Sequence, residues 1–169
     1  NRNQFLCLPE LLRRKGYSTS WIHNADAAYD NQLIMFPKIG FQKIIDRFDF
    51  ASNTETLGWG FSDEALFEKW IKILDQEKEP FFSSALTTTN HHPFDVPEKF
   101  QRFENRSVQN KYYEAVNYVD SVLNQFLIEA SKTKWFENTL IFVTSDTSNY
   151  QNPQKPFSNF EDFVKTRSK

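Results

Sequence analysis

The chain has 169 residues and a mass of 20.0 kDa, enough for one domain with a hydrophobic core and too little for two. Apolar residues make up 39% and charged residues 25%, which excludes a wholly disordered or fibrous protein. The net charge of -2 gives no electrostatic reason to expect a nucleic acid partner. No apolar run approaches the roughly 18 residues that cross a bilayer, and no signal segment is visible. A helical pattern that is already under way near the first residue suggests that the true N-terminus lies upstream.

The first third of the chain predicts a helix, a strand and a less regular stretch. A leucine stripe followed by glycine predicts a helix over residues 5–15. Aromatic and β-branched residues alternate with serine over 17–22, which favours a strand that ends at His23 and Asn24. Residues 25–60 contain short apolar clusters broken by proline and glycine, and we expect irregular structure with one or two short helices there.

Helices and strands continue to alternate along the rest of the chain. Ser62 is a typical helix N-cap, and the apolar residues that follow keep a helical period up to residue 74. Residues 81–87 predict a strand, and residues 107–131 a long helix with one apolar face. Residues 139–144 form a nearly continuous apolar run, which is typical of a strand buried on both faces.

This alternation predicts an α/β protein, a three-layer α/β/α fold with a mainly parallel sheet. Ligand sites in such sheets form outside the carboxyl ends of the strands. Polar residues follow three of the predicted strands: His23 with Asn24, Asn90 with His91 and His92, and Asp146. We expect these three turns to meet on one rim of the sheet.

Each candidate residue also has a simpler interpretation. His91 and His92 are adjacent, so on an extended backbone only one of them faces a given pocket. Such a pair before a proline is either structural or solvated, or it supplies a proton donor or a metal ligand. Asp146 can ligate a divalent cation or cap a turn. Trp59 lies between two glycines, so its indole is either a flat wall against a ligand or a core residue.

Four segments, in order along the chain, carry a resemblance to a known family. They lie at residues 8–17, 58–64, 90–94 and 135–143, and the most specific are His-His-Pro-Phe and Trp-Phe-Glu-Asn-Thr. With these segments the chain resembles the sulfatase-like branch of the alkaline phosphatase superfamily, in particular the lipoteichoic acid synthase or phosphoglycerol transferase type.

The resemblance implies an alkaline-phosphatase-like fold, incomplete here, from a membrane-anchored parent with an extracytoplasmic catalytic domain. In such enzymes a Thr or Ser nucleophile, activated by a divalent metal (Mn, Mg or Zn), attacks a small-molecule or lipid-linked phospho- or sulfo-ester. Carried over by position, His91 is the catalytic histidine that contacts the transferred group or the leaving oxygen. Trp59 and Asn90 join His91 in contacting the substrate, and Asp146 is a metal ligand.

The chain departs from the family pattern after Asp146, where the family has histidine and this chain has Thr147. A hydroxyl is a poor replacement for neutral imidazole toward such a cation, so the expectation of a metal holds for the parent family more than for this chain. The segments with the nucleophile and the first acidic ligand would lie upstream of Asn1. We therefore expect a partial sulfatase-like catalytic domain over 1–148 and a divergent polar tail over 149–169.

The predicted function is that of a metal-dependent phospho- or sulfo-ester hydrolase or transferase fragment that is inactive in the form of this chain. One alternative is a degenerate, non-catalytic ligand-binding module of the same fold. Another is a frameshift or deletion near Thr147, which would explain both the absent histidine and the altered tail. An incomplete sheet would also expose an edge strand and an aromatic face, which favours self-association.

Overall fold

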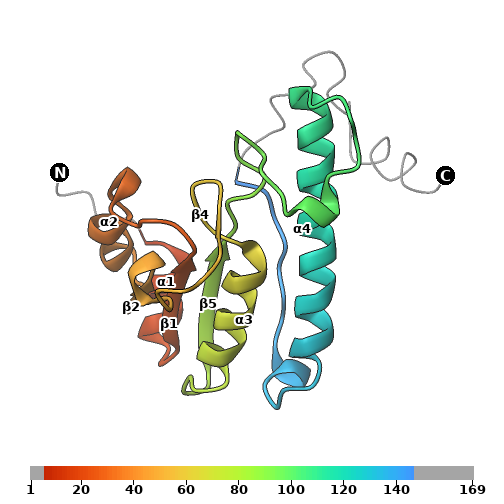
Figure 1. Ribbon diagram of the computed structural model, residues 1–169. Coiled ribbons are helices and arrows are strands. Elements are labelled where there is room, and N and C mark those ends of the chain that lie inside the picture. Colours follow the sequence, from red (N-terminus) through yellow and green to blue (C-terminus); the bar gives the residue numbers. More distant parts are fainter. Residues whose placement is uncertain (1–5, 147–169) are drawn as a thin grey trace, which may run out of the picture. The chain divides into compact units, whose positions relative to one another are not determined.

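The computed structural model describes residues 6–146, and its main unit ends at Thr139 (Figure 1). Three strands form a parallel sheet: β1 (Ser18–His23), β2 (Lys43–Ile45) and β5 (Phe81–Leu86). Their order is β2-β1-β5, so β1 is central. A parallel sheet with helical connections confirms the predicted α/β class.

Helices cover both faces of this sheet, as a parallel sheet requires. Side chains alternate between the faces along a strand, so Trp21 and Ser83, on β1 and β5, point to opposite sides. Phe36 of helix α2 (Gln32–Lys38) packs edge-on against Trp21, with ring centroids 4.4 Å apart. On the other face, Trp70 of helix α3 (Asp63–Leu74) donates a hydrogen bond of 2.7 Å to Ser83. The predicted three-layer arrangement is therefore confirmed.

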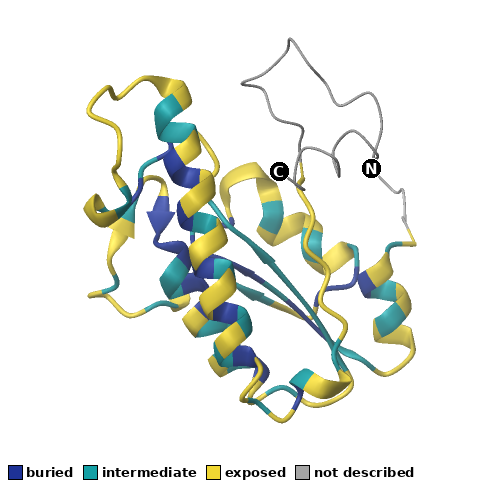
Figure 2. Cartoon of the chain, turned by 90° about the vertical axis from the view of Figure 1, so that its right-hand side faces the viewer, coloured by how far each residue is buried: buried dark blue, intermediate teal, exposed yellow. Residues whose placement is uncertain are grey.

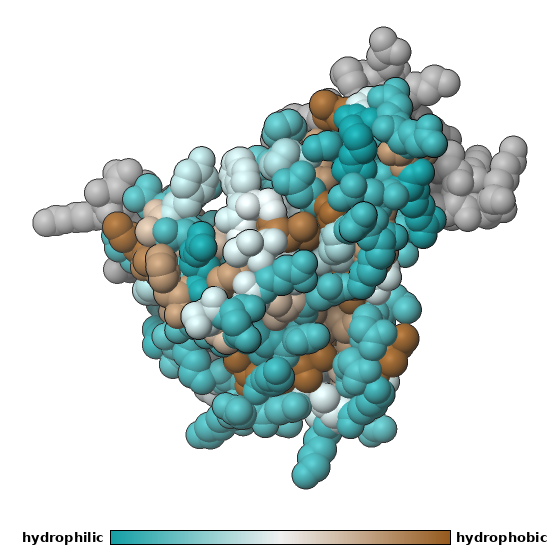
Figure 3. Space-filling model, in the orientation of Figure 1, coloured by the Kyte–Doolittle hydropathy of each residue, from teal (hydrophilic) through white to brown (hydrophobic). Residues whose placement is uncertain are grey.

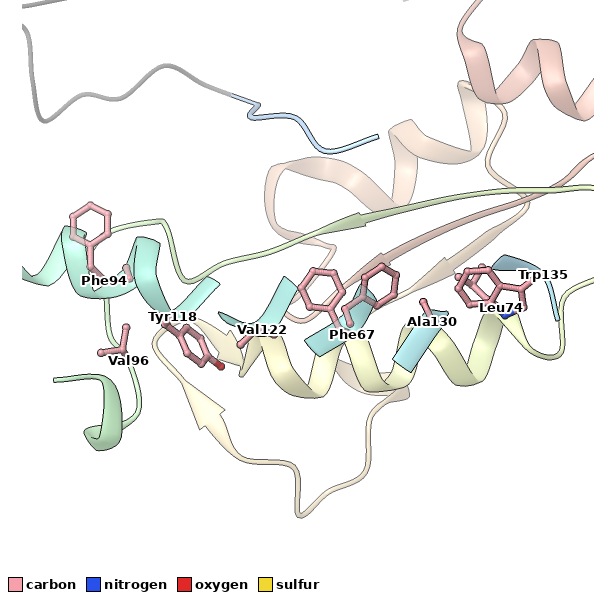
Figure 4. Packing of buried hydrophobic residues seen from close by; sticks show 10 residues of the cluster. Phe67, Leu74, Phe94, Val96, Tyr118, Val122, Ala130 and Trp135 are labelled. Carbon is pink, nitrogen blue, oxygen red and sulfur yellow. The ribbon is translucent and has the colours of Figure 1, made fainter. Parts of the chain in front are cut away.

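The core lies between α3 and the long helix α4 (Val108–Ala130). Trp70 of α3 stacks on Phe126 of α4 with centroids 5.1 Å apart and planes 9° from parallel. Helix α4 is buried along one side and exposed along the other (Figure 2). The buried hydrophobic cluster is largely aromatic and runs along both helices (Figure 4), with the members Phe67, Leu74, Phe94, Val96, Ala115, Tyr118, Val122, Phe126, Ala130 and Trp135.

The remaining elements are short. Helix α1 (Leu8–Arg14) packs against β1, and the hairpin of β3 (Thr56–Leu57) and β4 (Gly60–Phe61) precedes α3. Four single-turn 3-10 helices are η1 (Tyr29–Asn31), η2 (Arg47–Asp49), η3 (Glu98–Phe100) and η4 (Phe136–Asn138). The stretch predicted to be irregular, residues 25–60, thus holds α2 but also a strand of the main sheet, β2, which the sequence did not predict.

The strand predicted over residues 139–144 does not form, which corrects the prediction. Residues 140–146 belong to a second unit, described by itself, and the structure assigns neither helix nor strand to these seven residues. Leu140 and Phe142 are 84% and 86% exposed. An apolar run becomes a strand only where a neighbouring strand takes up its backbone hydrogen bonds, and no strand among residues 6–146 pairs with this segment. The predicted tail over 149–169 and Thr147 lie outside the described residues.

The surface of the described chain is mixed in polarity. The face seen in Figure 3 is mostly hydrophilic, with hydrophobic side chains in small separate patches. Helix α4 is the longest described helix, but it carries charged residues throughout, and none of the helices within residues 6–146 is long and apolar enough to cross a membrane.

Candidate functional site

A buried polar network joins the carboxyl ends of β1 and β5. Asn24 follows β1 directly, and its side-chain amide donates a hydrogen bond of 2.9 Å to the Oδ1 atom of Asp63, the first residue of α3. The backbone amides of Thr88 and Thr89, just beyond β5, donate to the two carboxylate oxygens of Asp63 at 3.1 and 3.4 Å. One carboxylate therefore connects three segments at the edge of the sheet where ligand sites form.

Asp63 is fully buried, as is Asn24. Burial raises the pKa of the Asp63 carboxyl above its ordinary value, while the hydrogen bonds from Thr89, Thr88 and Asn24 act in the opposite direction. No Lys, Arg or His within residues 6–146 forms an ion pair with this carboxylate. The network therefore depends on hydrogen bonds alone to offset the cost of burial.

The β3–β4 hairpin places Trp59 at its tip, above this network. Gly58 has φ +60°, as a type II′ hairpin requires of its first turn residue, and Trp59 is the second. Gly60 serves a different purpose, because a Cβ atom there would lie 2.4 Å from the backbone oxygen of Asn24. The glycines flanking Trp59 thus allow a turn and a close backbone contact within the protein. Trp59 itself is 52% exposed, which excludes the interpretation as a core residue.

The indole of Trp59 meets the imidazole of His91 at the surface. Their ring centroids are 4.1 Å apart and their planes are tilted by 43°. Tyr29 adds an edge-on contact to the other side of Trp59, with centroids 6.1 Å apart. Figure 1 shows that the β3–β4 hairpin and the segment after β5 lie at the same end of the sheet. Residues 32 positions apart in the chain, each predicted as a site residue on its own, therefore come together.

Hydrogen bonds fix the imidazole of His91 in one orientation. Its Nδ1 atom lies 2.8 Å from the backbone oxygen of His92, and because a carbonyl oxygen only accepts, Nδ1 carries the hydrogen. The Nε2 atom is then the one available to a ligand. The turn itself is closed by a bond of 3.0 Å from the His91 amide to the Thr88 carbonyl. It ends at Phe94, a buried residue with φ +60°, a conformation that costs a non-glycine residue about 1–3 kcal/mol.

A small hollow separates the hairpin from the turn. Its volume is about 10 Å³, roughly the space of one water molecule. The hairpin contributes Leu57, Gly58 and Trp59, and the segment after β5 contributes Thr88, Thr89, His91, His92, Pro93 and Asp95. Asn90 directly precedes His91 in the sequence and is exposed, but it does not line this hollow.

The other predicted rim residues have different surroundings. His23 is buried, and its Nδ1 atom donates to the Leu86 carbonyl at 3.0 Å, which ties the last residues of β1 and β5 together. His92 is exposed, with its ring edge-on to Phe94 at 5.8 Å. Asp146 lies in the separate segment 140–146 and is exposed. It is not at the end of a strand, because the strand predicted before it does not form.

A metal site is not complete in the described part of the chain. Within residues 6–146, no three side chains of His, Cys, Asp or Glu gather closely enough to hold a metal ion. Asp146 alone supplies one carboxylate, whereas tetrahedral zinc sites use three or four protein ligands. The described residues therefore do not fit the divalent metal that the resemblance implies.

The sequence interpretation missed Asp63, Thr88 and Thr89. An aspartate directly after a serine N-cap has a sufficient local explanation in the helix dipole, and threonines after a strand have one in turn formation. The one available signal was the position of Asp63 inside a segment that carried the resemblance.

Comparison with known proteins agrees with this architecture. The family model described as Sulfatase matches residues 1–159. Among curated proteins, the chain is 27% identical over 150 residues to lipoteichoic acid synthase 1 of Bacillus subtilis (strain 168) and 30% identical over 149 residues to the lipoteichoic acid synthase-like protein YvgJ of the same organism. Each match covers 85% of this chain and 24% of the relative, so the chain spans about a quarter of the length of these proteins.

Solved structures show the same likeness. The lipoteichoic acid synthase LtaP from Listeria monocytogenes matches with a TM-score of 0.67 and 30% identity, over 73% of this chain and 32% of that one. A protein in the alkaline phosphatase superfamily from Vibrio parahaemolyticus matches with a TM-score of 0.69 and 31% identity, over 79% and 33% of the two chains. The chain therefore belongs to the sulfatase family, within the lipoteichoic acid synthase-like branch of the alkaline phosphatase superfamily.

Proposed function

We propose that this chain provides the substrate-contacting part of a phospho- or sulfo-ester transferase of the lipoteichoic acid synthase type, in which His91 and Trp59 bind the ester. The observation that carries the proposal is the contact of these two rings, 4.1 Å apart, at the carboxyl edge of the sheet. An aromatic wall beside an imidazole suits a small ester, whose carbon skeleton packs on the ring and whose oxygens accept hydrogen bonds.

His91 has one nitrogen for this purpose. Since Nδ1 is bonded to the His92 carbonyl, Nε2 faces the ligand. In the charged form Nε2–H donates to a phosphoryl or sulfuryl oxygen, or gives its proton to the leaving oxygen, and in the neutral form Nε2 accepts.

The remaining predicted roles are part of the same proposal. Asn90 would add an amide donor beside His91, and Asp146 would contribute one carboxylate ligand to the metal of the family. Since the described residues do not assemble a metal site, we derive no step through a metal. For the whole protein we propose, from the family resemblance, a membrane anchor and an extracytoplasmic catalytic domain acting on a lipid-linked ester.

Calorimetric titration with glycerol phosphate tests the binding site. The wild-type chain should bind it saturably, and His91→Gln should weaken binding roughly tenfold, the loss of one charge-assisted hydrogen bond. Phe48→Leu is the matched control, because this ring is 76% exposed and does not line the hollow, and it should bind as the wild type does. Absence of binding by the wild-type chain, or equal weakening by both variants, contradicts the proposal.

An activity assay separates the enzyme from the non-catalytic alternative. We expect this chain alone, supplied with manganese, to show negligible turnover of nitrophenyl phosphate and nitrophenyl sulfate. Turnover that His91→Ala abolishes would overturn the expectation of inactivity. Glycerol phosphate binding that is the same with and without manganese would favour the binding-module alternative.

A further inference from the structure

The carboxylate of Asp63 is not explained by its place in helix α3. An aspartate in a first helical turn is ordinarily exposed, where it interacts with the helix dipole and orphan amides. Here the Ser62 hydroxyl already caps the helix, accepting from the Ala65 amide at 3.2 Å. Asp63 is instead fully buried, which is unfavourable for an ionised carboxylate unless its oxygens accept hydrogen bonds.

The hydrogen bonds that this carboxylate accepts hold the segment carrying His91. The Thr88 amide donates to Asp63, and the Thr88 carbonyl accepts from the His91 amide, so a single residue connects the carboxylate to the turn. The Thr89 amide adds a second, longer bond at 3.4 Å, and its hydroxyl a third. Within the described residues, all hydrogen bonds from residues 88–92 to other elements of the fold end on Asp63.

The same carboxylate reaches the Trp59 hairpin through Asn24. The Asn24 side chain donates both to Asp63 at 2.9 Å and to the Phe61 carbonyl at 2.6 Å. The Asn24 backbone oxygen accepts from the Phe61 amide at 2.9 Å, and Gly60 lies directly against that oxygen. Strand β4 is thereby fixed two residues after Trp59.

We propose that Asp63 is a positioning residue for the ligand site: its buried carboxylate locks the Thr88–Thr89 peptides and, through Asn24, strand β4, and so brings the His91 imidazole against the Trp59 indole. Asp63 touches no ligand in this scheme and acts only through the two rings. The inference rests on the proposed function for its biological meaning, since the ring pair is the proposed site.

The test is the NMR signature of the ring pair in Asp63→Asn. The chain has three histidines, so the His91 ring protons can be assigned by their loss in His91→Gln. In the wild type, the indole 4.1 Å away should shift these signals, and Trp59→Leu should abolish that shift. Asparagine keeps the size of Asp63 but replaces one acceptor oxygen with an NH2 donor, so we expect most of the shift to be lost.

Asp46→Asn is the matched control. Asp46 is also a buried aspartate at a strand end, where its two oxygens accept from the Ala27 and Phe48 amides at 3.1 and 3.0 Å, and it has no described bond to residues 88–92. This variant should keep the His91 ring shift even where it lowers the melting temperature. A folded Asp63→Asn chain that keeps the shift, or an Asp46→Asn chain that loses it equally, overturns the positioning role.

If Asp63→Asn does not fold, amide hydrogen exchange in the wild type tests the positioning role instead. The Thr88 and Thr89 amides should exchange roughly 100-fold more slowly than that of Asn90, for which no described residue accepts. Equal exchange at the three positions overturns the proposal. Neither experiment contains a ligand, so failure of glycerol phosphate to bind would remove the proposed function while leaving the positioning role to be decided separately.

Discussion

The protein contains two buried carboxylates, Asp63 and Glu114, whose hydrogen-bond and ion-pair partners differ. Glu114 lies on α4, is 2% exposed, and accepts from the Arg102 and Phe103 amides at 2.6 and 2.9 Å. It also forms an ion pair with Arg106. Asp63 likewise accepts backbone amides, but its other described partners are neutral.

The difference appears in the two pKa values. Burial raises the pKa of Glu114, but the bonds from Phe103 and Arg102 and the charge of Arg106 outweigh it, so the net shift is downward. The pKa of Asp63 is raised because burial dominates there. Glu114 holds a loop that is adjacent in sequence, whereas Asp63 joins segments up to 39 residues away at the edge of the sheet. We infer that the buried carboxylate of Asp63, which has no cationic partner among the described residues, serves the proposed site, because strongly perturbed carboxylates cluster at functional sites.

Removing Glu114 should have the largest effect on stability. Glu114→Ala removes the buried acceptor of the Arg102 and Phe103 amides and of the Arg106 guanidinium, and we expect a loss of about 3 kcal/mol in the free energy of unfolding. Urea unfolding measures it. Glu104→Ala, on an exposed residue of the same loop, should change little. If the free energy of unfolding fell no more in Glu114→Ala than in Glu104→Ala, the structural role of Glu114 would be contradicted.

Adding one methyl group at Gly60 should rank second. The new Cβ atom would lie 2.4 Å from the Asn24 oxygen, a backbone atom that cannot move aside alone, so we expect Gly60→Ala to cost about 2 kcal/mol. Gly16→Ala is the control, with φ +89° but no atom within 4 Å, and should cost about 1 kcal/mol. Thermal unfolding of both variants gives the ranking, and the reverse order would contradict the close packing of β4 on Asn24.

The two carboxylates should respond to pH with opposite signs. The lowered pKa of Glu114 gives stability that is present above its ordinary value of 4.5 and is lost as the pH falls through the folded-state value. The raised pKa of Asp63 gives a contribution that is present below its ordinary value of 3.8 and is lost as the pH rises through the folded-state value. On acidification, the free energy of unfolding of the wild type should therefore fall toward that of Glu114→Gln. Over the same change of pH, the wild type should become more stable relative to Asp63→Asn. Parallel pH profiles of the two differences would contradict this.

The alternation of helix and strand could be predicted where local signals were sufficient. The Ser62 cap and the apolar period fixed α3 to within a residue, and the alternation over residues 17–22 located β1. Strand β2 has three residues, too few for a pattern to be recognised, and it forms because β1 lies beside it. The apolar run at 139–144 had the composition of a strand but lacks a pairing partner within residues 6–146.

The surface residues of the proposed site could be named from the sequence, but the buried residues that support them could not. His91 was singled out by its place after a predicted strand and Trp59 by its flanking glycines, and both by the family resemblance, whereas Asp63 has an ordinary explanation at a helix start. Its role depends on hydrogen bonds among residues 24, 63, 88 and 89. Residues 24, 63 and 88–89 lie far apart in the sequence, so no local pattern predicts the bonds. The meeting of His91 with Asp146 stays a prediction, because Asp146 lies in a unit described by itself.

Substitution of the surface residue Trp59 should cause the smallest change in stability. Trp59→Phe alters a half-exposed side chain, so the free energy of unfolding should change by less than about 0.5 kcal/mol. Glycerol phosphate binding should nevertheless weaken, because the smaller ring reduces contact with both His91 and the ligand. Phe48→Leu, at a residue that is 76% exposed, is the control and should affect neither quantity. A large loss of unfolding free energy in Trp59→Phe would indicate that Trp59 has a structural role instead.

The most direct measurement is the affinity for glycerol phosphate in Asp63→Asn and Glu114→Gln, each titrated well below its own melting temperature. If the carboxylate at the sheet edge serves the ligand site and the one on α4 serves the fold, Asp63→Asn should bind roughly tenfold more weakly than wild type and Glu114→Gln should bind equally well. Equal weakening in both variants, or no binding by the wild type, would contradict this account.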